Sequence, residues 1–204
     1  MRKTALISAI LLASLQVLAP DAGAYTVSYR QTVTTGQGGA PAIQMRVWVK
    51  DDKMRVETDT GSGQGIMIFK DKEMYTYVPQ QGMWMKMPHG QDAEFQYVED
   101  SEKYVQYLEK QGAVKTGSET VNGYPCDIYE YKDKQSGADV TAWVWKEKEF
   151  PVKMVLAGPG IDSQVLFSNI RVNEPISDEM FEVPRSQKTV DMTNIKGMLK
   201  AFQD

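Results

Sequence analysis

Residues 42–87 read AIQMRVWVKDDKMRVETDTGSGQGIMIFKDKEMYTYVPQQGMWMKM, and this stretch has the clearest pattern in the chain. Short runs of alternating apolar and polar residues are separated by turns rich in Gly, Asp and Lys. Side chains of a strand point alternately to its two faces, so the alternation predicts short strands with one apolar face. Loops this short cannot hold a parallel crossover, and the strands are therefore predicted to form an antiparallel meander.

The apolar rows of this meander are rich in methionine, whose flexible thioether side chain adapts to ligands of irregular shape. Any β-domain also needs apolar rows for its core. From the residues alone, a filled core and a ligand-sized hydrophobic cavity both remain open. The candidate cavity residues are Met45, Val47, Val49, Met54, Val56, Met83, Met85 and Met87.

After residue 88 the apolar spacing changes from that of a strand to that of a helix. The pattern predicts an inserted amphipathic helix from Asp92 to Lys110, with Asp92 as its N-cap and Gly112 as its stop. Its apolar face needs an oily surface to cover, for which the methionine-rich face of the sheet is the candidate. The apolar positions are Phe95, Val98, Val105 and Leu108.

The C-terminal tail, residues 185–204, has a second apolar stripe at helical spacing. Gly197 costs about 1 kcal/mol of helix propensity relative to Ala, so this marginal helix must dock or bind something. Docking on its own domain is one interpretation, and a mobile lid or a segment that meets a partner or a membrane is the other. The stripe consists of Met192, Ile195, Met198, Leu199 and Phe202.

Strand patterns resume between the inserted helix and the tail. Asn122-Gly123 and Pro159-Gly160 mark turns, and residues 176–181 are expected to form a short turn or helix. The whole chain offers roughly ten or eleven strands at regular spacing, which is typical of an all-β sandwich, a barrel or a strongly curved sheet.

Residues 1–24 have the pattern of a cleaved signal peptide. Arg2 and Lys3 precede an apolar run from Ala5 to Leu18, and residues 22–24 (AGA) form a small-x-small cleavage site. The mature protein is therefore expected to be soluble and periplasmic, with a retained anchor helix as the alternative.

Composition points away from catalysis and from nucleic acid. The net charge is −4, whereas phosphate binding needs a basic surface, which only a local patch can supply here. One histidine, His89, and one cysteine, Cys126, are too few for a transition-metal site or a nucleophile–base pair. Cys126 is expected to be a small buried core residue, with a reactive thiol as the alternative. We predict no catalytic residue, no metal and no cofactor.

Several phrases of the chain resemble, in order, a known superfamily. Lys53–Glu57 (KMRVE) and Met74–Tyr77 (MYTY) resemble the LolA/LolB type of periplasmic lipoprotein carrier, whose fold RseB-like sensors share. Asp178–Pro184 (DEMFEVP) resembles the closing phrase of that superfamily, while Thr116–Asp127 and Thr141–Met154 look closer to a branch of unassigned function. The resemblance implies a mainly β fold with some α: a curved antiparallel sheet, or incomplete barrel, covered by the inserted helix and a C-terminal helix.

The resemblance also implies a function. We expect a signal peptide (1–24), a LolA-like half-barrel (25–184) and an amphipathic tail (185–204). The leading hypothesis is a non-catalytic periplasmic protein that holds a lipid or a lipoprotein acyl chain in a hydrophobic cavity, for transport or outer-membrane biogenesis. Arg55 is the candidate gating residue. The lid residues are Phe95, Val98, Leu108, Met198 and Phe202.

The expected partners are a lipid or an acylated lipoprotein and an envelope membrane protein, not nucleic acid. The alternative hypothesis is an envelope sensor or protein-interaction module of the RseB type. Its contacts would come from the C-terminal stripe or from exposed tryptophans on the row opposite the apolar one. These are Trp48, Trp84, Trp143 and Trp145.

Overall fold

The computed structural model describes residues 26–36, 42–59, 64–88, 104–134, 136–158 and 161–192. These residues form one sheet with the strand order β12-β6-β5-β4-β3-β2-β1-β11-β10-β9-β8-β7. The strands are β1 (Thr26–Thr35), β2 (Ile43–Lys50), β3 (Lys53–Asp59), β4 (Gln64–Lys70), β5 (Glu73–Val78), β6 (Met83–Pro88), β7 (Val114–Val121), β8 (Tyr124–Lys132), β9 (Asp139–Trp145), β10 (Phe150–Gly158), β11 (Ile161–Val172) and β12 (Thr189–Asp191). Two helical segments accompany them, α2 (Tyr104–Lys110) and the 3-10 turn η1 (Asp178–Phe181).

Two antiparallel meanders make up the sheet, and they join where β1 pairs with β11. Tight turns set their registers. Asp51 and Asn122 adopt the left-handed conformation, with φ of 52° and 51°, and Gly123 follows at 85°. Asp, Asn and Gly tolerate this conformation best, which is why such turns alternate with apolar strands in the sequence.

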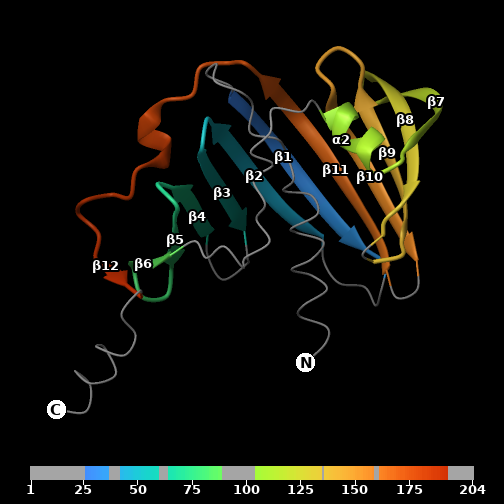
Figure 1. Ribbon diagram of the computed structural model, residues 1–204. Helices are drawn as coiled ribbons and strands as arrows, with labels where there is room; N and C mark the ends of the chain where they lie inside the picture. Colours follow the sequence, from blue (N-terminus) through green and yellow to red (C-terminus); the bar gives the residue numbers. More distant parts are fainter. Residues whose placement is uncertain are drawn as a thin grey trace.

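The sheet curves without closing, because its two outer strands, β12 and β7, do not pair with each other. Figure 1 shows it bent around an inner side on which α2 lies close to β9 and β10. We call this side the concave face and the opposite side the convex face. The expected fold class, a curved antiparallel sheet in the form of an incomplete barrel, is confirmed.

The core lies on the concave face. At its centre the ring of Tyr29 packs 5.4 Å from those of both Phe150 and Phe167, centroid to centroid. Val27, Val47 and many neighbours on β1–β3 and β8–β11 are buried around this cluster. A smaller second cluster lies on the convex face of β4–β6, beneath the segment that contains η1.

The inserted helix is confirmed where the structure describes it. Helix α2 ends as expected, because Gly112 has a φ of 83° and its N–H donates to the carbonyl of Glu109 at 2.8 Å. Left-handed glycine is a common helix stop. The earlier part of the expected helix, 92–103, lies outside the described residues, as do His89 and the expected signal peptide, residues 1–24.

Two expectations about the sheet need correction. The described residues contain twelve strands rather than ten or eleven. The additional one, β12, belongs to the tail that was expected to be helical, and it pairs in parallel with β6 from Thr189↔Trp84 to Asp191↔Lys86. The edge of β6 offers unpaired backbone groups, and their hydrogen bonds outweigh the weak helical pattern locally. The tail beyond residue 192 lies outside the described residues.

Candidate functional site

The candidate site is the concave face of β2–β6, where register brings the methionines together. Val47 pairs with Val56 and Val49 with Met54, so these expected site residues share one face. Strands β4 and β5 add two methionines to this face that were not among the expected site residues. Met67 lies opposite Val56, and Met74 lies opposite Met87. The alternation of apolar and polar residues in the sequence could have identified Met67, because it assigns Met67 and Phe69 to the same face of the strand.

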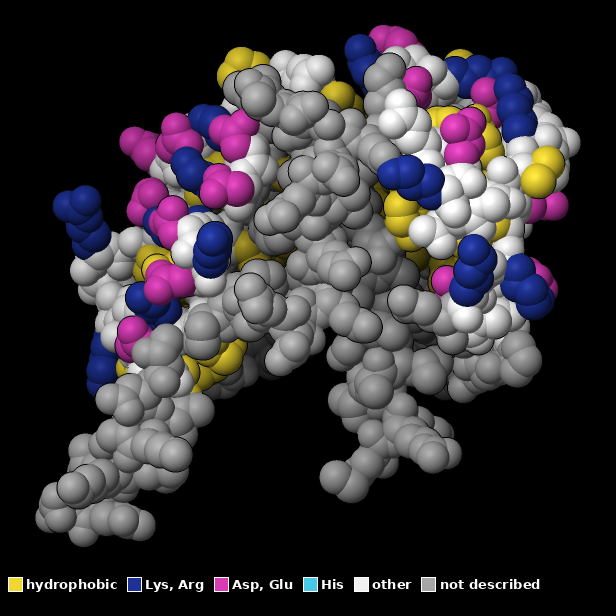
Figure 2. Space-filling model, in the orientation of Figure 1, with side chains coloured by type: hydrophobic (Ala, Val, Ile, Leu, Met, Phe, Trp, Pro, Cys, Tyr) yellow, Lys and Arg dark blue, Asp and Glu magenta, His cyan; other side chains and the backbone are white. Residues whose placement is uncertain are grey.

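Burial changes along this face. At the centre of the sheet Met45, Val47, Val49, Met54 and Val56 are 1, 0, 3, 6 and 1% exposed. Toward the β6 edge the methionines are half-buried instead. These are Met67, Met74, Met83, Met85 and Met87. We call this set of seven, Met45 and Met54 together with the five half-buried residues, the methionine face. Figure 2 shows some hydrophobic side chains along the inner margins of the two ends of the sheet and charged side chains on their outer sides.

A polar side chain interrupts the apolar floor of the concave face. Gln31, on the central strand β1, pairs with Met45 on one side and Phe167 on the other. It is 0% exposed, and neither its Nε2 nor its Oε1 has a hydrogen-bond partner among the described residues. The hydroxyl of Ser163 on β11 is in the same situation. A buried polar group without a partner costs about 1–3 kcal/mol, so a water or a ligand group that bonds to these atoms would stabilise the protein.

Helix α2 covers part of the concave face. Tyr104 and Leu108 are buried at 4 and 0% exposure, and the Tyr104 hydroxyl lies 3.3 Å from the sulfur of Met154 on β10. Burial raises the pKa of Tyr104 well above its ordinary value, so the phenol stays neutral. Leu108 was an expected lid residue, whereas Tyr104 was missed. The other lid residues, Phe95, Val98, Met198 and Phe202, lie outside the described residues.

Arg55, the candidate gating residue, lies on the convex face, away from the methionine face. Its guanidinium donates to Oε1 of Glu57 at 2.9 and 2.8 Å. Its Nη1 donates to the carbonyl oxygen of Met180 at 3.0 Å. These contacts tie η1 to the outside of the sheet.

Trp143 and Trp145 pack against the main core cluster. Trp48 and Trp84 lie on the convex face as expected, but Trp84 is not exposed. It is 2% exposed, and its indole N–H donates to Oε1 of Gln187 at 2.6 Å. The chain segment after β11 covers it, which strand alternation cannot reveal. Trp48, Trp143 and Trp145 are half-buried.

Over the described residues no group of three or more His, Cys, Asp or Glu side chains is placed to hold a metal ion. Cys126 is free and 0% exposed, as expected of a core residue, and burial raises the pKa of its thiol. In the part of the chain that the structure describes, no helix is long and apolar enough to cross a membrane.

Comparison with protein families gives one match. The family described as Domain of unknown function (DUF4412) matches residues 32–149, which is more than half of the chain. In a comparison with curated protein sequences, none matches this chain.

Several solved structures have a similar fold. An uncharacterized conserved protein from Thermus thermophilus is 9% identical, with a TM-score of 0.55, over 90% of this chain and 99% of that one. MucB in the MucA/MucB complex of Pseudomonas aeruginosa is 10% identical, with a TM-score of 0.56, over 88% of this chain. Our chain spans 62% of that MucB chain. At such identities these structures show the fold alone, and they confirm the expected LolA/LolB/RseB-like fold.

A LolA superfamily protein from Nitrosomonas europaea, NE2245, also matches, over 86% of this chain and 97% of that one. It is 10% identical and has a TM-score of 0.36. This score is too low to add to the assignment of the fold.

Proposed function

Because the chain belongs to the DUF4412 family, whose function is unknown, we propose a function for it from its own geometry. The protein is a non-catalytic binding protein of the bacterial envelope, and it holds a lipid or the acyl chain of a lipoprotein against its concave face. The signal-peptide pattern of residues 1–24 supports export to the periplasm.

The observation that carries the proposal is the methionine face. Seven methionines from five adjacent strands share one side of an open sheet, and five of them are only half-buried. A core that needed only filling would be served by branched aliphatic residues, such as the buried valines of β1 and β9. Methionine adapts to a flexible, irregular ligand at low cost. Burying an acyl chain there supplies about 0.8 kcal/mol per CH₂ group.

Gln31 supports the same proposal from a different direction. Its amide lies buried in the apolar floor, and no described residue bonds to it. An acyl ester or amide offers a carbonyl acceptor for Nε2, and an amide or hydroxyl of the ligand offers a donor for Oε1. A ligand with a long chain and one polar linkage therefore suits this face better than a plain hydrocarbon.

The first test is to identify what the protein holds. The mature protein is purified from its native periplasm and extracted with organic solvent, and the extract is examined by mass spectrometry. A lipid at one equivalent supports the proposal and identifies the class of ligand. A protein that is empty and takes up no fluorescent fatty acid contradicts it.

A substitution localises the binding. Met85→Asp places a charge on the half-buried part of the methionine face, toward the β6 edge, and is expected to abolish uptake of the fluorescent fatty acid. Val114→Asp is the matched control, because Val114 on the edge strand β7 is 64% exposed. The proposal fails if folded Met85→Asp protein binds the fatty acid like the wild type.

A second function is favoured by the free edge of β7. This strand pairs only with β8 among the described strands, and most of its side chains are exposed. Such an edge can accept a strand from another protein. MucB, whose fold is similar, was solved in complex with MucA. If the protein proves empty, a protein-interaction module of the envelope becomes the better hypothesis, tested by crosslinking from position 116 on β7.

A further inference from the structure

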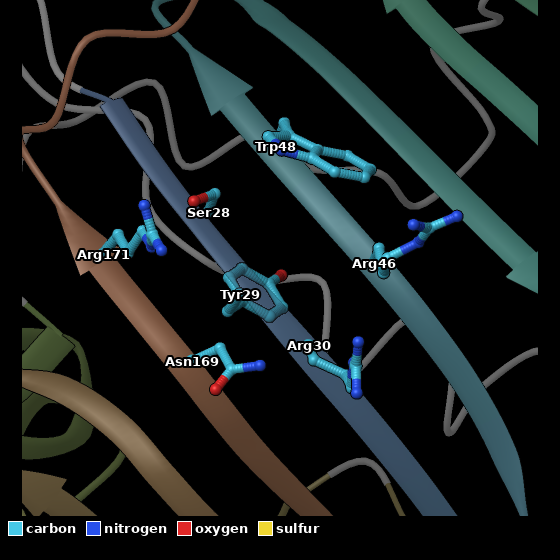
Figure 3. Close-up of a pocket in the computed structure, with 7 residues that line it drawn as sticks. All are labelled: Ser28, Tyr29, Arg30, Arg46, Trp48, Asn169 and Arg171. Carbon is cyan, nitrogen blue, oxygen red and sulfur yellow. The ribbon is translucent and has the colours of Figure 1, made fainter.

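A groove on the convex face lies on the other side of the sheet from the methionine face. Its first part has a volume of about 200 Å³, and β1 runs through its middle (Figure 3). Arg46 and Trp48 of β2 flank β1 on one side, and Asn169 and Arg171 of β11 flank it on the other. A second part of about 220 Å³ shares Trp48 and Arg171 with the first and continues along residues 174–180.

The pairing of the strands places like charges directly against each other in this groove. Arg30 on β1 lies opposite Arg46 on β2, an arrangement that destabilises a sheet unless an anion compensates it. Arg171 lies opposite Ser28, next along the same face of β1. The β1–β11 register shifts between Ser28 and Arg30, and Asn169 there has a φ of 52°. Bulges of this kind redirect side chains and are frequent beside binding sites.

The carboxylates nearby do not balance these cations. Arg46 pairs with Glu57 at 2.7 Å, but Glu57 also binds Arg55 at 2.8 Å. Arg171 pairs with Glu174 at 3.2 Å. Arg30 is exposed and has no ion pair with any described residue. Among the described residues, four guanidinium groups thus share two carboxylates, which leaves two positive charges at this place in a protein of net charge −4.

We propose that this groove binds a phosphate monoester, with its phosphate among Arg30, Arg46 and Arg171 and its organic part on Trp48. Guanidinium groups bind phosphate through paired N–H donors. The two negative charges of a phosphate monoester balance the two uncompensated positive charges, whereas a carboxylate has only one negative charge. The apolar side chains of Ile176 and Met180 in the second part of the groove give the organic substituent a surface.

Calorimetric titration of the mature protein with phenyl phosphate at low salt tests the site. Wild type is expected to bind it, and Arg30→Gln is expected to weaken binding by about tenfold or more, the usual effect of losing a charged hydrogen bond. Lys134→Gln is the control, because it removes the same charge from the exposed β8–β9 turn. Trp48→Leu is expected to weaken the binding of phenyl phosphate but to leave the binding of inorganic phosphate unchanged. Equal weakening by Lys134→Gln, or none by Arg30→Gln, would overturn the proposal.

A second set of measurements identifies the source of the monoester. Flotation with vesicles that contain phosphatidic acid, but not with vesicles of equal charge made from a phosphodiester lipid, indicates a lipid headgroup. Binding of phenyl phosphate without vesicle flotation indicates a soluble ester. Benzoate or a glutamate-rich peptide that binds more tightly than phenyl phosphate contradicts the proposal. The site does not depend on the acyl ligand, so Arg30→Gln should take up fluorescent fatty acid normally.

Discussion

Gln31 shows how a single residue can report on a ligand. Its amide is buried between Met45 and Phe167, with no hydrogen-bond partner in the described part of the chain. Methionine has nearly the same shape, so Gln31→Met removes two unsatisfied polar atoms and leaves no cavity. We expect the free energy of unfolding of the ligand-free protein to rise by about 1 kcal/mol or more. Urea denaturation measures this change.

The same substitution has a second expected consequence. Wild type should prefer a palmitoyl ester to hexadecane, whereas Gln31→Met should bind both alike, because its floor is wholly apolar. Ser28→Ala, at a convex position of the same strand, is the control and should change neither quantity. A destabilised Gln31→Met protein would mean that bound water satisfies the amide, and the argument for a polar linkage would then be lost.

Asp127 gives a pH-dependent prediction. Its carboxylate accepts a hydrogen bond from Ser118 at 2.7 Å and lies 2.8 and 3.1 Å from the ammonium groups of Lys115 and Lys146. Lys115 first, then Ser118 and Lys146, lower its pKa to about 2. The folded value lies below the unfolded one of about 3.9. The stabilisation is therefore complete above pH 3.9 and is lost as the pH falls toward 2.

The corresponding variant is Asp127→Asn. We expect it to be less stable than wild type by about 1 kcal/mol at pH 7 and equally stable near pH 2. Asp139→Asn removes an exposed ion pair with Lys132 and should have a smaller effect. A stability difference for Asp127→Asn that stays constant from pH 7 to pH 2 would contradict the assignment.

At the scale of elements, η1 joins the convex face through Phe181. This side chain is 0% exposed and packs with Ile68 and Trp84. Asp178, at the start of η1, is held by Lys50 and Lys53 at 3.0 and 2.9 Å. Phe181→Ala should lower the free energy of unfolding by about 3–5 kcal/mol, because a buried aromatic side chain leaves a cavity.

The matched variant is Val183→Ala at the half-buried margin of the same cluster. In urea denaturation it should lower the free energy of unfolding clearly less than Phe181→Ala does. Acrylamide quenching of tryptophan fluorescence gives an independent measure, since Trp84 should become accessible only in Phe181→Ala. Similar losses for the two variants would mean that Phe181 does not anchor the segment.

The elements also show where sequence patterns stop being informative. Alternation over 43–87 was enough to predict the meander and to assign Met45 and Met85 to one face. It could not predict β12, since three residues, Thr189–Asp191, carry no periodicity of their own and become a strand only because the edge of β6 is free. Likewise Trp84 lies on the expected row, but its burial depends on a segment about a hundred residues later in the chain.

At the scale of the whole molecule, alternation gives one sheet two chemically different surfaces. The concave face has the methionines and Gln31, while the convex face has Arg30, Arg46 and Trp48 of the same strands. The curvature and the pairing of β1 with β11 depend on contacts far apart in sequence, so the groove between these strands could not be predicted. No local sequence motif predicts that three arginines from three different strands line one groove.

The two surfaces share strands but no side chain, and this predicts how their ligands combine. A ligand at 100 times its dissociation constant stabilises the folded protein by about 2.7 kcal/mol. If the acyl chain and the phosphate monoester bind independently, their stabilisations should add when both are present. Urea denaturation with each ligand alone and with both measures this directly, and Met85→Asp and Arg30→Gln should each remove only one contribution. If the stabilisation with both ligands differs from the sum of the two separate stabilisations, the curvature of the sheet differs between the two bound states. A ligand on one face would then change the affinity of the other face for its ligand.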